Sequence, residues 1–127
     1  MVLHAKADDI IRSEMSATTL KIATENLDKA ARKFNEAEMK CNKLRKFRQD
    51  YVDRFNNEIK PRSDEYVQQS FASFFAKLDF VIHGQQEQVE TLGQEFQTQY
   101  KIWQECQRKH KAMQQKLEQS EELELVA

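Results

Sequence analysis

Apolar residues recur at alternating steps of three and four through most of the chain, and this repeat restricts the fold more than any other feature. In the first segment the apolar positions are Leu20, Ala23, Leu27, Ala30, Phe34, Ala37, Cys41, Leu44, Tyr51 and Phe55. In the second segment they are Phe71, Phe75, Leu78, Ile82, Val89, Leu92, Phe96, Trp103, Cys106, Met113 and Leu117. Only Arg48 interrupts the first repeat, and Gln85, Gln99 and His110 are polar members of the second. A period of 3.5 residues keeps one side of a helix apolar, so the sequence predicts two helices that supercoil with a left hand.

The only proline, Pro61, lies between the two repeats in the stretch NNEIKPRSDEY. Proline is not tolerated inside a helix, and it is expected to push the preceding residue, Lys60, out of helical geometry. Ser63 is a suitable N-cap for the following helix, with Asp64 and Glu65 favourably placed in its first turn. The stretch is therefore predicted to be a bend between two helices.

The predicted fold class is all-α, with one helix over about residues 8–58 and another over about residues 64–119. Together they form an antiparallel coiled-coil hairpin with its bend near Lys60–Asp64, in a single domain that spans residues 1–127, and the helix ends are expected to fray.

A single register explains the pairing of the two helices. If residues that face each other have numbers that add to 126, small residues lie opposite large ones. It places Ala23, Ala30 and Ala37 opposite Trp103, Phe96 and Val89, and Phe55 opposite Phe71. Such complementarity is what a close-packed seam requires. On the flank, Arg45 is expected opposite Asp79. Near the termini, Ile10 and Ile11 are expected to extend the first helix and to meet Met113 and Leu117.

Composition excludes several classes of function. The chain has 20 Lys and Arg against 21 Asp and Glu, so its net charge of −1 gives no reason to expect a nucleic acid partner. It contains no apolar run long enough for a membrane span, and its first residues lack the apolar core of a secretory signal. Two cysteines without a signal are expected to stay reduced in the cytoplasm.

No catalytic, metal or cofactor motif is found. Gly84 and Gly93 are isolated, whereas a phosphate-binding loop needs clustered glycines, and the three histidines are too far apart in sequence to form a ligand pair. The sequence therefore predicts a protein that is not an enzyme and binds no cofactor.

Aromatic residues near the bend exceed what a two-helix seam needs. Phe80 takes the heptad position farthest from the seam, Phe74 and Val81 lie at a flanking position, and Phe47 lies on the same flank of the first helix. They form either a widened core or a patch that docks a partner, since contiguous exposed apolar surface usually marks an interface.

Basic residues gather where the two ends of the hairpin should meet. They are Arg12, Arg108, Lys109, Lys111 and Lys116. These residues form either an ordinary solvated face or a basic tip that enters an acidic ring or cleft. An RNA- or lipid-binding tip is less favoured, because Glu118, Glu121 and Glu122 follow directly.

Three stretches resemble the FliJ-like flagellar export proteins, over about residues 10–120. LDKAARKFNEAEMKCNKLRKFRQDYVDRF is similar to the first helix of the family, with an L-x-x-[FY]-R-x-x-Y pattern at Leu44, Phe47, Arg48 and Tyr51. EYVQQSFASFFAKLDFVIHGQQEQVETL resembles the start of the second helix, and KIWQECQRKHKAMQQKLEQ resembles its close. The short tail after Gln119 departs from the family pattern.

The resemblance implies a stalk of the flagellar type III export apparatus, held in the pore of a hexameric export ATPase. It also implies contact with the membrane export gate through Phe74, Leu78 and Val81, contact with the ATPase near the paired termini, and handling of export chaperones. Such a protein would be cytoplasmic, peripheral to the inner membrane at the flagellar base, and monomeric when free.

Other classes remain open at this point. The equivalent stalk of a virulence type III secretion system has similar residues. A parallel two-chain coiled coil would turn Pro61 into a kink, and a membrane-surface helix would require one strongly basic face.

Overall fold

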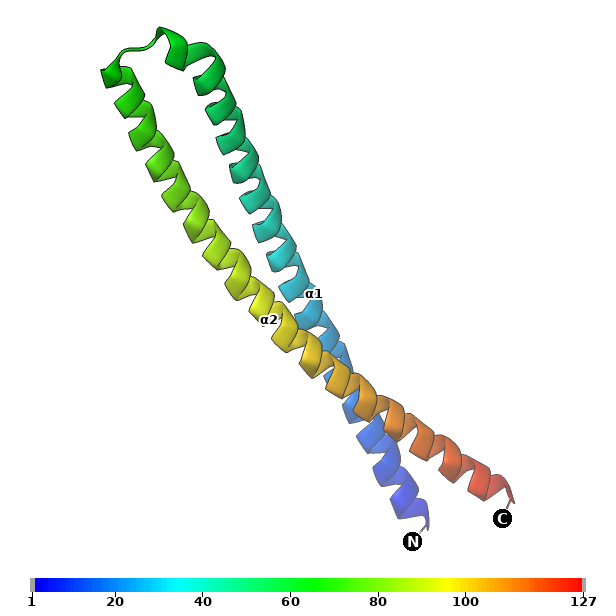
Figure 1. Cartoon of the computed structure of the whole chain (residues 1–127). Helices are drawn as coiled ribbons and strands as arrows, with labels where there is room; N and C mark the ends of the chain where they lie inside the picture. Colours follow the sequence, from blue (N-terminus) through cyan, green and yellow to red (C-terminus); the bar gives the residue numbers. More distant parts are fainter. Residues whose placement is uncertain (1, 127) are drawn as a thin grey trace. The chain divides into compact units, whose positions relative to one another are not determined.

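The computed structural model describes residues 2–126, with side chains described from Lys6 to Leu125. Helix α1 spans Val2–Arg54 and helix α2 spans Glu65–Val126. Between them lie a π-helical turn, η1, over Phe55–Ile59 and a 3₁₀ turn, η2, over Lys60–Arg62. The two long helices pack antiparallel, which confirms the predicted all-α hairpin (Figure 1).

Both helices extend beyond the ends expected from the heptad repeat. Helix α1 begins at Val2 rather than near residue 8, and α2 continues to Val126 rather than ending near residue 119. No glycine or proline occurs before Pro61 or after Gly93, so nothing in either terminal segment breaks a helix. An ion pair between Lys6 and Glu124 joins the two helices in these added turns.

The bend forms by widening the helix before proline ends it. The backbone N–H of Lys60 donates to the carbonyl of Phe55, which is the hydrogen bond of a π-turn. Lys60 keeps helical dihedrals (φ −54°, ψ −44°), so the expectation that Pro61 displaces it from helical geometry is wrong. Pro61 instead stands in the first turn of η2, where its missing N–H costs no helical bond, and the chain becomes extended at Ser63.

Asp64, rather than the predicted Ser63, caps α2. The Asp64 carboxylate accepts a hydrogen bond from the backbone N–H of Val67 at 2.9 Å. The Ser63 hydroxyl donates back to the carbonyl of Lys60 at 3.1 Å and so closes the turn before the helix. A carboxylate is well suited to the cap position because it also faces the positive end of the helix dipole.

The hairpin consists of two compact units, which we describe separately. The bend unit spans Arg32–Gln94, and the terminal unit contains the segments up to Ala31 and from Glu95. In the bend unit Ala37, Cys41 and Ile82 are buried. The rings of Phe55 and Phe71 lie 4.9 Å apart between centroids, as the predicted register requires.

The seam of the terminal unit is more polar than predicted. Ala23 and Ala30 are buried, but so are Asp9 and Ser13, whereas Ile10 and Ile11 are exposed. The expectation that these isoleucines extend the apolar seam is therefore wrong. The heptad phase explains the difference, because it directs positions 9 and 13 inward and positions 10 and 11 outward.

Hydrogen bonds join the two helices across this polar seam. The His110 ring lies 2.8 Å from the Ser16 hydroxyl, and the Gln114 amide donates to the Ser13 hydroxyl at 3.2 Å. One heptad further from the termini, the Trp103 indole N–H donates to the Thr24 hydroxyl at 3.1 Å. His110 is thus a satisfied polar member of the seam, as the sequence indicated.

The two glycines of the chain differ in what surrounds them. A Cβ on Gly93 would lie 3.0 Å from the Phe34 ring, whereas a Cβ on Gly84 would have no neighbour within 4 Å. Gly93 therefore lets the Phe34 ring lie against α2, and Gly84 has no such packing role.

We expect Gly84→Ala to raise the free energy of unfolding by about 0.5–1 kcal/mol, because alanine is the better helix former. Gly93→Ala is expected to lose this gain, since the Phe34 ring has to move. Urea denaturation followed by circular dichroism compares the two variants. Equal gains at both positions would contradict the packing role of Gly93.

Candidate functional site

An aromatic flank runs beside the seam of the bend unit, and we define it as Phe47, Tyr51, Phe74 and Val81. The Phe47 and Tyr51 ring centroids are 4.5 Å apart, and those of Tyr51 and Phe74 are 5.4 Å apart. Tyr51 therefore connects the predicted aromatic residues of the two helices. Phe47 remains 44% exposed and Phe74 38% exposed, so their rings cover one another only in part.

A shallow apolar hollow opens at this flank. It has a volume of about 230 Å³ and is lined by Tyr51, Ser70, Phe71 and Phe74. Sequence reasoning assigned Tyr51 and Phe71 wholly to the seam and did not single out Ser70. The hollow can receive an apolar side chain from a partner, because almost all of its lining is carbon.

The structure separates Phe80 from the aromatic flank. Six residues at 100° each rotate Phe80 about 120° away from Phe74 around the helix axis. Phe80 is 80% exposed and takes part in none of the ring contacts of the described residues. Val81 is also exposed, whereas Leu78 is half-buried at the edge of the seam.

Arg48 leaves the seam to form an ion pair with Asp79. Its guanidinium donates to both carboxylate oxygens, with the Nη2–Oδ2 bond at 3.3 Å, and lies 5.9 Å from the centroid of the Phe75 ring. The hydrogen bonds to Asp79 raise the pKa of Arg48, which is therefore fully charged. Arg48 can therefore occupy a seam position of the heptad repeat, because its guanidinium reaches the flank, where the charge stays hydrated.

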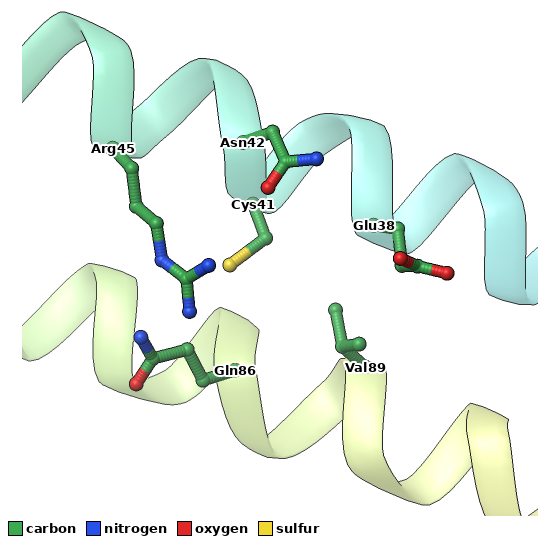
Figure 2. A pocket seen from close by; sticks show the side chains of 6 residues that line it. All are labelled: Glu38, Cys41, Asn42, Arg45, Gln86 and Val89. Carbon is green, nitrogen blue, oxygen red and sulfur yellow. The ribbon is translucent and has the colours of Figure 1, made fainter.

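The predicted pairing of Arg45 with Asp79 is wrong, because Arg48 occupies that carboxylate. Arg45 instead extends toward Gln86, beside the buried thiol of Cys41 (Figure 2). The pocket between them measures about 120 Å³ and is completed by Glu38, Asn42 and Val89. Ligand pockets are typically ~300–1,000 Å³, so this one has room for water rather than a substrate.

The predicted basic tip, Arg12, Arg108, Lys109, Lys111 and Lys116, is exposed in the terminal unit. Arg108 forms a two-pronged ion pair with Glu105, whose oxygens lie 2.5 and 3.1 Å from the guanidinium nitrogens. Hydrogen bonds from Arg108 lower the pKa of Glu105, and the same bonds raise the pKa of Arg108. Lys109 lies 3.9 Å from the same carboxylate.

Across the seam, Lys116 pairs with the buried Asp9 at 3.4 Å. Arg12 and Lys111 form none of the ion pairs of the described residues. The tip is therefore less strongly basic than its sequence indicates. Ion pairs this exposed contribute little to stability, so a partner's carboxylates can replace Glu105 at small cost.

Among the side chains described, from Lys6 to Leu125, no group of three or more His, Cys, Asp or Glu is arranged to hold a metal ion. The helices described, over residues 2–126, include none with the length and apolarity needed to cross a bilayer.

Comparison with known proteins gives one match. Residues 14–126 match the model of a family described as Flagellar FliJ protein. No curated protein and no solved structure matches the chain.

Proposed function

Because the chain belongs to the flagellar FliJ protein family and is thus a non-catalytic component of the flagellar export apparatus, we propose that it is the coiled-coil stalk of the export ATPase. The antiparallel hairpin supports this proposal, since a long helical pair is suited to a shaft or adaptor. As the stalk, it sits in the pore of the hexameric ATPase and links that ring to the membrane export gate.

The aromatic flank is the proposed gate-binding surface, together with Leu78 at its seam edge. Phe80 is proposed as a further gate contact, on the outer face of α2. The observation that carries this assignment is the chain of ring contacts from Phe47 through Tyr51 to Phe74. These rings stay partly exposed beside an apolar hollow, and this exposure supports a docking surface rather than a widened core.

The basic tip is the proposed ATPase contact. Arg12 and Lys111 offer charges without an acidic partner in the described chain, and Arg108 offers a planar donor that can exchange Glu105 for a carboxylate of the ring. Export chaperones are proposed as further partners on the basis of the family. The corresponding location is the cytoplasmic side of the inner membrane at the flagellar base.

The flagellar role is favoured over a virulence secretion system because the matching family is flagellar. A purely structural parallel dimer is not the observed arrangement, since the two helices of one chain pair with each other.

The ATPase contact can be tested by reversing charge at the basic tip. Arg108→Glu combined with Lys111→Glu is expected to weaken binding to the purified ATPase hexamer roughly tenfold at low salt, because it places like charges at the contact. Helicity and the melting temperature are expected to change little. Lys77→Glu, a single charge reversal on the bend unit, is the control.

Binding can be followed by surface plasmon resonance. Unchanged affinity of the doubly reversed variant at low salt would remove the basic tip from the proposed mechanism.

A further inference from the structure

The outer face of α2, opposite the seam, holds two features that the fold does not explain. Phe80 exposes 80% of its surface, and one turn further on Gly84 stands beside open space. A glycine within a helix is unfavourable by about 1 kcal/mol relative to alanine. Phe34 accounts for Gly93, but no contact within the chain accounts for Gly84.

These two residues belong to a stripe of exposed positions along the same face of α2. We define the outer stripe as Ser73, Lys77, Phe80, Gly84, Glu87 and Thr91. At 100° per residue all six lie within about 40° of one direction, so they share one side of the helix. The stripe faces away from the heptad seam that closes the hairpin.

The outer stripe is self-complementary about its centre at Ile82. If two copies of α2 lie antiparallel with a two-fold axis at this level, each Phe80 faces Gly84 of the other copy. By the same symmetry each Lys77 faces Glu87, and Ser73 faces Thr91. A large ring therefore meets a position without a side chain, and a positive charge meets a negative one, twice in each pair of molecules.

We infer that two copies of this chain associate through the outer stripe, with their α2 helices antiparallel. This arrangement explains why position 84 is a glycine: the missing side chain leaves the space that the phenyl ring of the other copy fills. Burying an aromatic ring in such a hole is the kind of contact that dominates small interfaces.

The charges of the stripe are available for this contact. Lys77 forms none of the ion pairs of the described residues. Glu87 pairs within its own helix with His83 at 3.1 Å, but both side chains are about 70% exposed, and such a pair contributes little. A second copy can therefore bring its lysine to Glu87 without breaking a buried interaction.

The association is expected to be weak. Each hairpin closes its own seam, so it does not need a second copy in order to fold, and one helical face gives an interface at the low end of the size range. Free chains are monomeric when dilute and pair at high concentration. Phe80 is shared with the proposed gate-binding surface. Lys77, Gly84 and Glu87, on which the test below depends, belong to neither the proposed gate contact nor the proposed ATPase contact.

The test exploits the predicted charge pairing. Sedimentation velocity of the full chain, from roughly 10 to roughly 500 µM, covers the range in which an interface of this class dissociates. The unaltered protein is expected to shift toward the mass of two chains. Lys77→Glu alone and Glu87→Lys alone are each expected to weaken pairing roughly tenfold or more, because like charges then face each other twice.

An equimolar mixture of these two variants is expected to regain pairing. In a mixed pair, one chain carries glutamate at both positions and the other carries lysine at both, so every predicted contact is again between opposite charges. If the two helices paired in parallel, position 77 would face position 77 of the other copy, and like charges would already face each other in the unaltered protein. A single charge reversal would then not weaken pairing.

Gly84→Leu is the shape control, since it fills the hole that receives Phe80. It is expected to weaken pairing roughly tenfold while the melting temperature stays the same or rises. Two results would overturn the inference: a wild-type mass that remains that of one chain at the highest concentration, or a mixture that pairs no better than its separate components.

Discussion

Replacing Ile82 with alanine is expected to lower the free energy of unfolding by about 2–4 kcal/mol. Ile82 is 6% exposed and is the one large aliphatic side chain among the buried residues described. Truncating it removes contacts in a seam that is only one layer of side chains wide. The remaining buried residues of the bend unit, Ala37 and Cys41, are too small to fill the space.

The neighbouring residue supplies the control for this experiment. Val81 is 52% exposed, so Val81→Ala is expected to change the free energy of unfolding by no more than about 0.5 kcal/mol. Urea denaturation followed by circular dichroism measures both variants. Equal losses at positions 81 and 82 would mean that the register places the wrong side of α2 against α1.

Replacing Phe74 with alanine is expected to weaken binding to the export gate about 30-fold, equivalent to about 2 kcal/mol. Phe74 is part of the ring network of the aromatic flank and lines its hollow, so its loss removes both an exposed ring and a wall. The effect on stability is expected to be smaller, because Phe74 is 38% exposed in the free protein.

Leu78→Ala provides the comparison, since Leu78 is half-buried at the seam and its loss is expected to lower both stability and gate affinity. Phe80→Ala is expected to lower gate affinity without lowering stability. Thermal melting and calorimetric titration with the cytoplasmic part of the gate protein separate the two effects. If Phe74→Ala destabilises the hairpin as much as Leu78→Ala and retains gate affinity, the aromatic flank is only a widened core.

The heptad repeat predicts the packing of this chain because it records which side of each helix is buried. The pairing of Phe55 with Phe71 follows from the repeat and one register constant, and the ring contact confirms it. The aromatic excess near the bend was likewise visible in the sequence. The contact of Phe47 and Phe74 through the Tyr51 ring was not visible in the sequence, because a heptad position does not show how far a ring extends beyond the seam.

Local details of the bend and flanks were harder to predict. Ser63 and Asp64 are both good caps, and only the hydrogen bond to Val67 distinguishes them. The choice of Arg48 over Arg45 as the partner of Asp79 depends on side chains that reach several positions with similar energies. Apolar character alone does not predict the terminal seam, because the heptad phase turns Ile10 and Ile11 outward despite their apolar side chains.

The polar seam of the terminal unit determines whether one helix can slide along the other. A purely apolar heptad seam offers similar packing after a shift of seven residues, so it resists sliding weakly. Here such a shift would separate Trp103 from Thr24 and His110 from Ser16, and would leave the buried Ser13 and Asp9 without their present partners. Hydrogen bonds depend on the relative position of donor and acceptor more strictly than apolar contacts do. These polar side chains therefore resist sliding of the two helices along their axes. A force applied along one helix of this unit is transmitted to the other.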